Sequence, residues 1–119
     1  MRIRRAVLVA CIAVLSAAVP VFAHHSLQAE YNVNMPITLK GTVTKVAWNN
    51  PHVHLFMDVK DNSNEVMIWE LTLGSPNSQF LKGWKIDTLR PGDHITVTAY
   101  PARAGANMGY AQKITITPP

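Results

Sequence analysis

The stretch ITLKGTVTKVAW, residues 37–48, decides the fold of this chain. Its first seven residues alternate with period two, which is typical of a β-strand with one buried face. The alternation then changes phase, because Val46 and Trp48 stand on even positions. A phase change close to Gly41 predicts a β-bulge in a long and strongly bent strand.

Four more strands are predicted after this one, each bounded by turn residues. The stretches NNP, DNSNE, LRPGD and PARAGANMG are rich in the glycine, proline, asparagine and aspartate that form turns. Between them lie segments that alternate with period two and contain many β-branched and aromatic residues. The predicted strands cover residues 52–60, 66–73, 94–100 and 110–117.

The segment GSPNSQFLKGW, residues 74–84, breaks the strand pattern. Ser75 or Asn77 is placed to cap a short helix, and Gly83 is placed to end it. Three strands, a short helix and two strands form the layout of the OB-fold, a five-stranded Greek-key barrel. We therefore predict a mainly β, OB-like barrel, with an open antiparallel sandwich of the same strands as the alternative. Core positions are expected to include Val43, Leu55, Ile95 and Val97.

The N-terminus reads as a secretory signal. Three arginines precede an apolar run over residues 6–19, Pro20 breaks the run, and Val21-Phe22-Ala23 resembles a cleavage site. About 14 apolar residues are fewer than the roughly 20 that a spanning helix needs, so we expect no stable membrane anchor after cleavage. A lipoprotein box at Cys11 and twin-arginine export are weaker interpretations. The predicted domains are a signal peptide (1–23), an N-terminal arm (24–36) and the barrel (37–119), with a periplasmic or secreted product.

Removal of the signal changes the charge of the chain. The full sequence has 11 basic and 7 acidic residues and a net charge of +4. Without Arg2, Arg4 and Arg5, the chain has eight basic and seven acidic residues, and its net charge falls to +1. Nucleic-acid binding usually needs a dense basic face, so we expect no nucleic acid among the partners. Cys11, the one cysteine, leaves with the signal, which excludes disulfides and thiolate ligands in the mature chain.

Five separated motifs carry a resemblance to a known family. AHHS, LKGTVTKVAWNNPH, GSPN, GW and LRPGD occur in this order. Together they resemble a family of small exported bacterial proteins known mainly as a domain of unknown function. The resemblance covers essentially the whole mature chain and implies export and an OB-like barrel, but no reaction. The matching residues are His24, His25, Trp48, Asn50, Pro51, His52 and Gly74 to Asn77, whereas His54 departs from a position that is often aromatic.

Histidines are the candidate metal ligands. After cleavage behind Ala23, His24 offers both a free α-amine and an imidazole, which chelate a metal in one ring. A second imidazole then completes the three-nitrogen arrangement called a histidine brace, which suits Cu(II). His52 and His54 lie two apart on a predicted strand and point the same way, so either can supply that imidazole. The candidate metal site consists of His24, His25, His52 and His54.

A structural role for these histidines is the competing interpretation. The ring of His52 can bond a backbone carbonyl at the turn, and His94 reads as a surface residue. Glu70 stands in an apolar strand and needs a partner such as Lys45 or a histidine. No spacing singles out a catalytic pair of carboxylates, and the protein is expected to bind rather than catalyse.

Two functions follow from these interpretations. The first is an exported binding protein that takes copper at its mature N-terminus. The alternative is a module that docks an unknown protein or small ligand without a metal.

Overall fold

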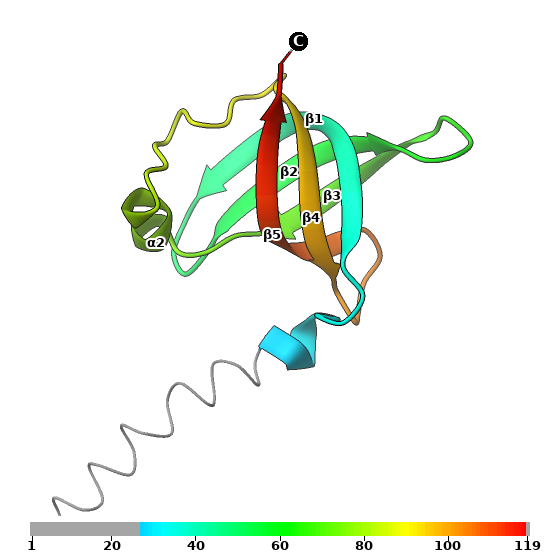
Figure 1. Ribbon diagram of the computed structural model, residues 1–119, viewed down its shortest axis with the longest axis horizontal. Coiled ribbons are helices and arrows are strands. Elements are labelled where there is room, and N and C mark those ends of the chain that lie inside the picture. The colour runs from blue at the N-terminus through cyan, green and yellow to red at the C-terminus, as the bar shows by residue number, and fades with distance from the viewer. Residues whose placement is uncertain (1–26, 119) are drawn as a thin grey trace, which may run out of the picture. The chain divides into compact units, whose positions relative to one another are not determined.

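A computed structural model describes residues 27–118 of the 119-residue chain. Residues 27–30 are helical, and the unit that contains the strands begins at Tyr31. The elements of this unit are β1 (Ile37–Trp48), β2 (Val53–Lys60), β3 (Val66–Thr72), α2 (Pro76–Leu81), β4 (His94–Pro101) and β5 (Met108–Thr117) (Figure 1). Within residues 27–118, no helix is long and apolar enough to cross a lipid bilayer.

The five strands close into a barrel with the order β1-β2-β3-β5-β4. All neighbours are antiparallel except β3 and β5, which pair in parallel over three residues, Glu70 to Thr72. The short helix α2 stands between β3 and β4 in the chain (Figure 1). This confirms the predicted OB-like barrel and excludes the open sandwich.

The predicted bulge in β1 is present. The register with β2 shifts between Val43 and Lys45, so Thr44 is the extra residue. The bend lets β1 pair with β4 through its first half and with β2 through its second half. Gly41 pairs with both neighbours, and a Cβ at this position would collide with the carbonyl oxygen of Asp58. Glycine is required here because the backbone of β2 approaches so closely.

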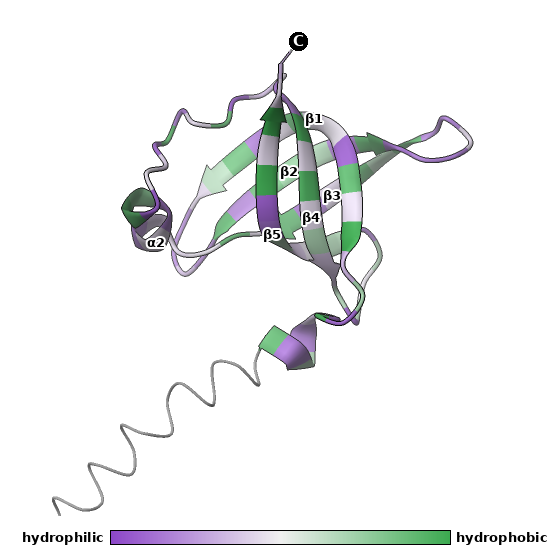
Figure 2. Cartoon of the chain, viewed as in Figure 1, coloured by the Kyte–Doolittle hydropathy of each residue, from purple (hydrophilic) through white to green (hydrophobic). Residues whose placement is uncertain are grey.

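The barrel core forms where the inward positions of the strands meet. All four predicted core residues are at most 1% exposed. Hydrophobic and hydrophilic residues alternate along the strands (Figure 2). Trp48, Trp69 and Trp84 pack against this core as partly buried side chains, as expected for core-edge residues. The fully buried members are Val43, Val53, Leu55, Met57, Leu71, Ile95, Val97 and Ala99.

The β5 strand begins at Met108, two residues earlier than predicted. Met108 and Gly109 pair with Glu70 and Leu71 of β3, and this long-range pairing extends the strand into a stretch that reads as a loop. A Cβ on Gly109 would come within 2.8 Å of the Tyr100 carbonyl oxygen, so glycine here allows close strand packing rather than a turn.

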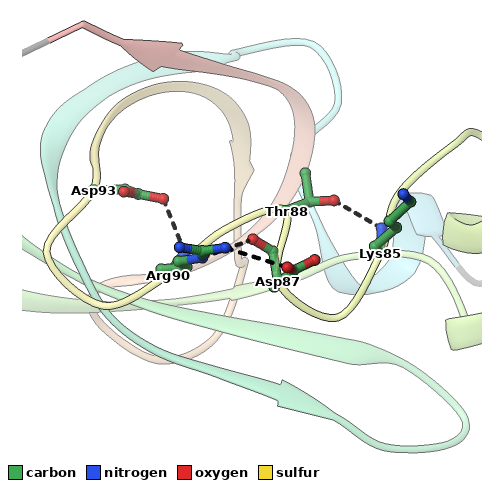
Figure 3. A network of polar contacts seen from close by, with 5 residues as sticks. All are labelled: Lys85, Asp87, Thr88, Arg90 and Asp93. Carbon is green, nitrogen blue, oxygen red and sulfur yellow. Dashed lines mark hydrogen bonds and ion pairs between the residues drawn. The ribbon is translucent and has the colours of Figure 1, made fainter.

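A polar loop connects α2 to β4. Arg90 donates to the Asp87 carboxylate through Nη2 at 3.2 Å, and the Arg90 amide donates to Asp93 at 2.9 Å (Figure 3). The Lys85 amide donates to the Thr88 hydroxyl at 2.7 Å. Leu89 is only 3% exposed and anchors this loop in the core.

Helix α2 has a predicted residue as its N-cap and ends, after its C-cap residue Lys82, at the predicted Gly83. Ser75 accepts a hydrogen bond from the Ser78 amide at 3.1 Å. Gly83 follows the C-cap residue with a φ of 92°, a conformation that glycine adopts without strain. Of the two predicted N-caps, Ser75 is therefore the one used.

Replacing Ser75 with alanine should lower the free energy of unfolding by about 1 kcal/mol, because an amide of the first turn loses its acceptor. Urea denaturation followed by circular dichroism measures the change. Asn77→Ala is the matched control, since Asn77 lies in the first turn and is exposed. An equal loss in both variants would contradict the cap assignment.

Candidate functional site

The outward side chains of the barrel form rows across neighbouring strands. Ladder partners point to the same side of a sheet, so the strand register identifies the members of each row. The Phe56 row consists of Lys45, Phe56, Glu70 and Met108. The His54 row consists of Ala47, His54, Thr72 and Tyr110. We call these two rows the outer face.

The outer face lies beside two connecting loops. The His54 row follows the β1–β2 turn, residues 49–52, and the Phe56 row ends at Met108, directly after the β4–β5 loop, residues 102–107. In OB-folds the face of the second and third strands, together with these two loops, binds oligonucleotides and oligosaccharides. The outer face is therefore the candidate binding site of this barrel.

The Phe56 row joins a cation to an aromatic ring. The Lys45 ammonium lies 5.6 Å from the centroid of the Phe56 ring, within the range of a cation–π contact. Phe56 is half-buried and lies between Lys45 on β1 and Glu70 on β3. One positive and one negative charge thus flank an aromatic ring.

The carboxylate of Glu70 lies beside the ring of His54. The Nδ1 atom of His54 lies 3.4 Å from a Glu70 carboxylate oxygen, and the two side chains are 34% and 36% exposed. His54 Nδ1 is buried and makes no hydrogen bond within the described chain, so this contact is electrostatic and strengthens when the ring is protonated. The prediction that Glu70 needs a partner is confirmed, with histidine in place of Lys45.

Tyr31 attaches the segment before β1 to the outer face. Its hydroxyl donates to Thr72 Oγ1 at 3.2 Å, and its ring packs against Tyr110 with centroids 5.6 Å apart. A single β-bridge joins Tyr31 to Ala102. Burial, and then the neighbouring Tyr31 hydroxyl, raise the pKa of Tyr110 above its usual value. The Tyr110 phenol therefore stays neutral and can donate a hydrogen bond.

His52 lies at the turn that precedes β2, and its side chain is held by the backbone. Its Nδ1 atom is 2.9 Å from the carbonyl oxygen of Leu73. A carbonyl only accepts, so Nδ1 carries the proton and Nε2 carries the lone pair. The expected bond from His52 to a carbonyl is confirmed. A bond of this kind from one ring nitrogen is also common in histidines that ligate a metal through the other nitrogen.

The remaining histidines are placed as follows. His24 and His25 lie outside the described residues. Within residues 27–118, no three histidine, cysteine, aspartate or glutamate side chains converge as a metal site. His94 is exposed at the start of β4, and its Nδ1 is 3.3 Å from the Thr42 hydroxyl, in agreement with a surface role.

Sequence reasoning missed most of the outer face. Lys45, Phe56, Thr72 and Tyr110 were not predicted as site residues, and Tyr31 fell in a stretch without clear periodicity. The alternation of β2 did indicate part of the face, because His54 and Phe56 alternate with buried core residues and must therefore point outward. Which outward residues stand in one row depends on the register, which no single strand reveals.

Solved structures of similar shape share the fold. The dimeric N-terminal domain of PriB from Thermoanaerobacter tencongensis superposes with a TM-score of 0.55 at 19% identity, and the match covers 72% of this chain and 99% of that domain. The mitochondrial single-stranded DNA-binding protein Rim1 from S. cerevisiae superposes with a TM-score of 0.52 at 13% identity, covering 69% and 91% of the two chains. Such identities show a common fold alone. No curated protein matches the sequence.

The exclusion of nucleic acid as a partner is corrected by these structures. It was based on the net charge of +1 expected for the mature chain. Rim1, which has the same fold, is a single-stranded DNA-binding protein. Net charge describes the whole chain, whereas binding depends on one face, so a low net charge does not exclude nucleic acid.

The family comparison covers most of the chain. Residues 11–112 match one family, which includes all five strands of the barrel except the end of β5. The histidine pair, the β1 stretch and the motifs around α2 all lie within this match. The chain belongs to DUF6152, a family of unknown function.

Proposed function

We propose that this protein is an exported binding module that holds its ligand on the outer face. The observation that carries the proposal is the clustering of rings and hydrogen-bonding groups in two adjacent rows of β2 and β3. His54, Glu70 and Thr72 offer polar atoms, and Phe56 and Tyr110 offer apolar rings. Binding sites combine apolar surface with a few placed polar groups in this manner. Export follows from the signal predicted over residues 1–23, with a periplasmic or secreted product.

A titration with three classes of probe should localise the ligand on the outer face. The probes are an oligo-dT strand, a set of neutral oligosaccharides and a set of extended peptides. Proton–nitrogen NMR spectra of residues 24–119 should show that the class that binds shifts the amides of Phe56, Glu70 and Thr72. Amides of α2 serve as the internal control and should stay in place. Shifts confined to α2, or no shift with any class, would contradict the proposal.

A second candidate function is copper binding at the mature N-terminus. It is favoured by the His52–Leu73 bond, which leaves the Nε2 lone pair of His52 available to a metal. The α-amine and imidazole of His24 would supply two more nitrogens, a set that suits tetragonal Cu(II). His25 and His54 are the further candidate ligands.

The length of the N-terminal segment limits this copper site. Tyr31 is held beside Thr72, the ladder partner of His54. Six residues lie between His24 and Tyr31, and the seven Cα–Cα steps that join the two span at most about 25 Å. The imidazole that completes the copper site with His24 must therefore lie within this distance of Tyr31.

A further inference from the structure

We infer that two copies of this chain pair through an open edge of β3. Residues 66–69 pair with β2 on one side, but β5 joins the other side of β3 only at Glu70. In this part of the molecule β2 and β3 extend away from the other strands as a hairpin (Figure 1). We call the unpaired side of residues 66–69 the open edge. The inference does not depend on what the outer face binds.

The open edge presents backbone groups that have no partner strand. The Glu70 amide donates to the Asn107 carbonyl oxygen at 3.0 Å, so the backbone groups of Glu70 point away from β2. The alternation of an antiparallel ladder gives Ile68 and Val66 the same direction. Within residues 27–118, no strand or loop backbone bonds to these groups of Val66 and Ile68. Each residue therefore offers one N–H donor and one C=O acceptor along the edge.

The side chains at the open edge leave it accessible. Val66 is 55% exposed and Ile68 is 66% exposed. Natural proteins commonly protect an open edge with lysine, proline or a bulge, because an exposed apolar edge pairs with other strands. Residues 66–69 read Val-Met-Ile-Trp, contain neither lysine nor proline, and keep a regular register with β2. This edge is thus suited to accept a further strand.

Only one register of two β3 strands satisfies all of these backbone groups. When Val66 of each copy lies opposite Ile68 of the other, each of the two pairs exchanges two hydrogen bonds, and the contact is isologous. A shift by one residue would set Val66 and Ile68 against residues that bond to β2. A shift by two would use either Glu70, whose amide already bonds to Asn107, or Asn64, whose φ of 66° is not extended. The edge is therefore complementary to itself, which favours a second copy over an unrelated peptide.

The same register brings complementary side chains together. Val66 of each copy lies beside Ile68 of the other as an apolar cross-strand pair. The hairpin tip, residues 61–65, carries two carboxylates and no cation. It comes beside the β4–β5 loop of the second copy, because Asn107 of that loop lies at the end of the open edge. Arg103 is the one charged residue of this loop, so the two surfaces have opposite charge.

Sedimentation equilibrium of the purified protein tests the inference. We expect a reversible dimer with a dissociation constant of about 10–100 µM, because the interface is small. Ile68→Lys should weaken association at least about tenfold, since it places a charge at the edge and removes an apolar contact. Ile86→Lys is the matched control, because Ile86 is 67% exposed in the loop between α2 and β4 and should leave the dimer unchanged. Both variants should keep the circular dichroism spectrum of the native barrel.

Cysteine cross-linking tests the register. In the inferred pairing, residue 67 lies opposite itself as a non-hydrogen-bonded pair with Cα atoms about 4.5 Å apart, a distance that suits a disulfide. With Cys11 replaced by serine and oxidised glutathione as the oxidant, Met67→Cys should give a covalent dimer. Val66→Cys is the matched control and should cross-link more slowly, because Val66 lies opposite Ile68 and not opposite itself.

The outcomes separate this inference from the proposed function. A protein that stays monomeric at about 1 mM would overturn the dimer. A dimer that Ile68→Lys leaves intact, or that Val66→Cys cross-links faster than Met67→Cys, would do the same. Amide shifts of Val66 and Ile68 caused by an extended peptide, in a chain that stays monomeric, would make a peptide the occupant and overturn the second copy. The proposed function is followed through other amides, those of Phe56 and Thr72, so each proposal can fail without the other.

Discussion

Replacing Val97 with aspartate should unfold the barrel. Val97 is fully buried, and its ladder partners are Leu39 on β1 and Ile114 on β5. An aspartate there would place an unpaired charge among apolar side chains, at a cost of several kcal/mol. Small domains have only about 5–15 kcal/mol of stability in total. We expect the cooperative thermal transition in circular dichroism to disappear or to fall by tens of degrees.

The neighbouring residue provides the control for this substitution. Thr98 points outward on the same strand and faces Lys113 of β5. An aspartate at Thr98 stays in solvent and meets an opposite charge, so Thr98→Asp should change the melting temperature by only a few degrees. If Val97→Asp melted at the same temperature as Thr98→Asp, the placement of Val97 in the core would be wrong.

Adding one residue before His24 should weaken Cu(II) binding by about a hundredfold or more, if copper is bound through the mature N-terminus. The extension converts the α-amine into an amide and keeps the imidazole, so it removes one arm of the chelate. Competitive titration with a chromophoric chelator compares the two forms. Intact-mass measurement of the exported protein establishes whether the natural chain begins at His24, which this copper site requires.

Single substitutions identify the second imidazole of the copper site. His52→Ala should weaken binding sharply, because it removes the ring that Leu73 orients. His94→Ala is the matched control, since it removes an exposed imidazole elsewhere and should have little effect. Binding should also weaken in acid, because amine and imidazole nitrogens must lose their protons to coordinate a metal. Equal copper affinity in the native and extended forms would eliminate the chelate and leave the outer face as the functional site.

Features that depend on neighbouring residues were predictable from the sequence. The bulge in β1 follows from the change of phase between Val43 and Val46, because side chains alternate with period two. The cap at Ser75 and the end of α2 at Gly83 follow from local backbone chemistry. The core follows from the inward phase of each strand, which hydrophobic burial selects.

Features that depend on register and closure were decided only by the tertiary structure. The sequence required a partner for Glu70, but the pairing of β2 with β3 selected His54 over Lys45. The early start of β5 arises from its parallel pairing with β3, which is a contact between distant segments. The Tyr31–Thr72 hydrogen bond joins residues 41 positions apart.

The candidate site shows the same division. Strand periodicity assigns His54 and Phe56 to the outward side of β2, but it does not say which residues of β1, β3 and β5 stand beside them. A shift of one residue in register would replace every neighbour in a row, because the side-chain period is two. Local patterns therefore determined which side chains are buried, whereas the closure of the barrel decided which exposed side chains form the outer face.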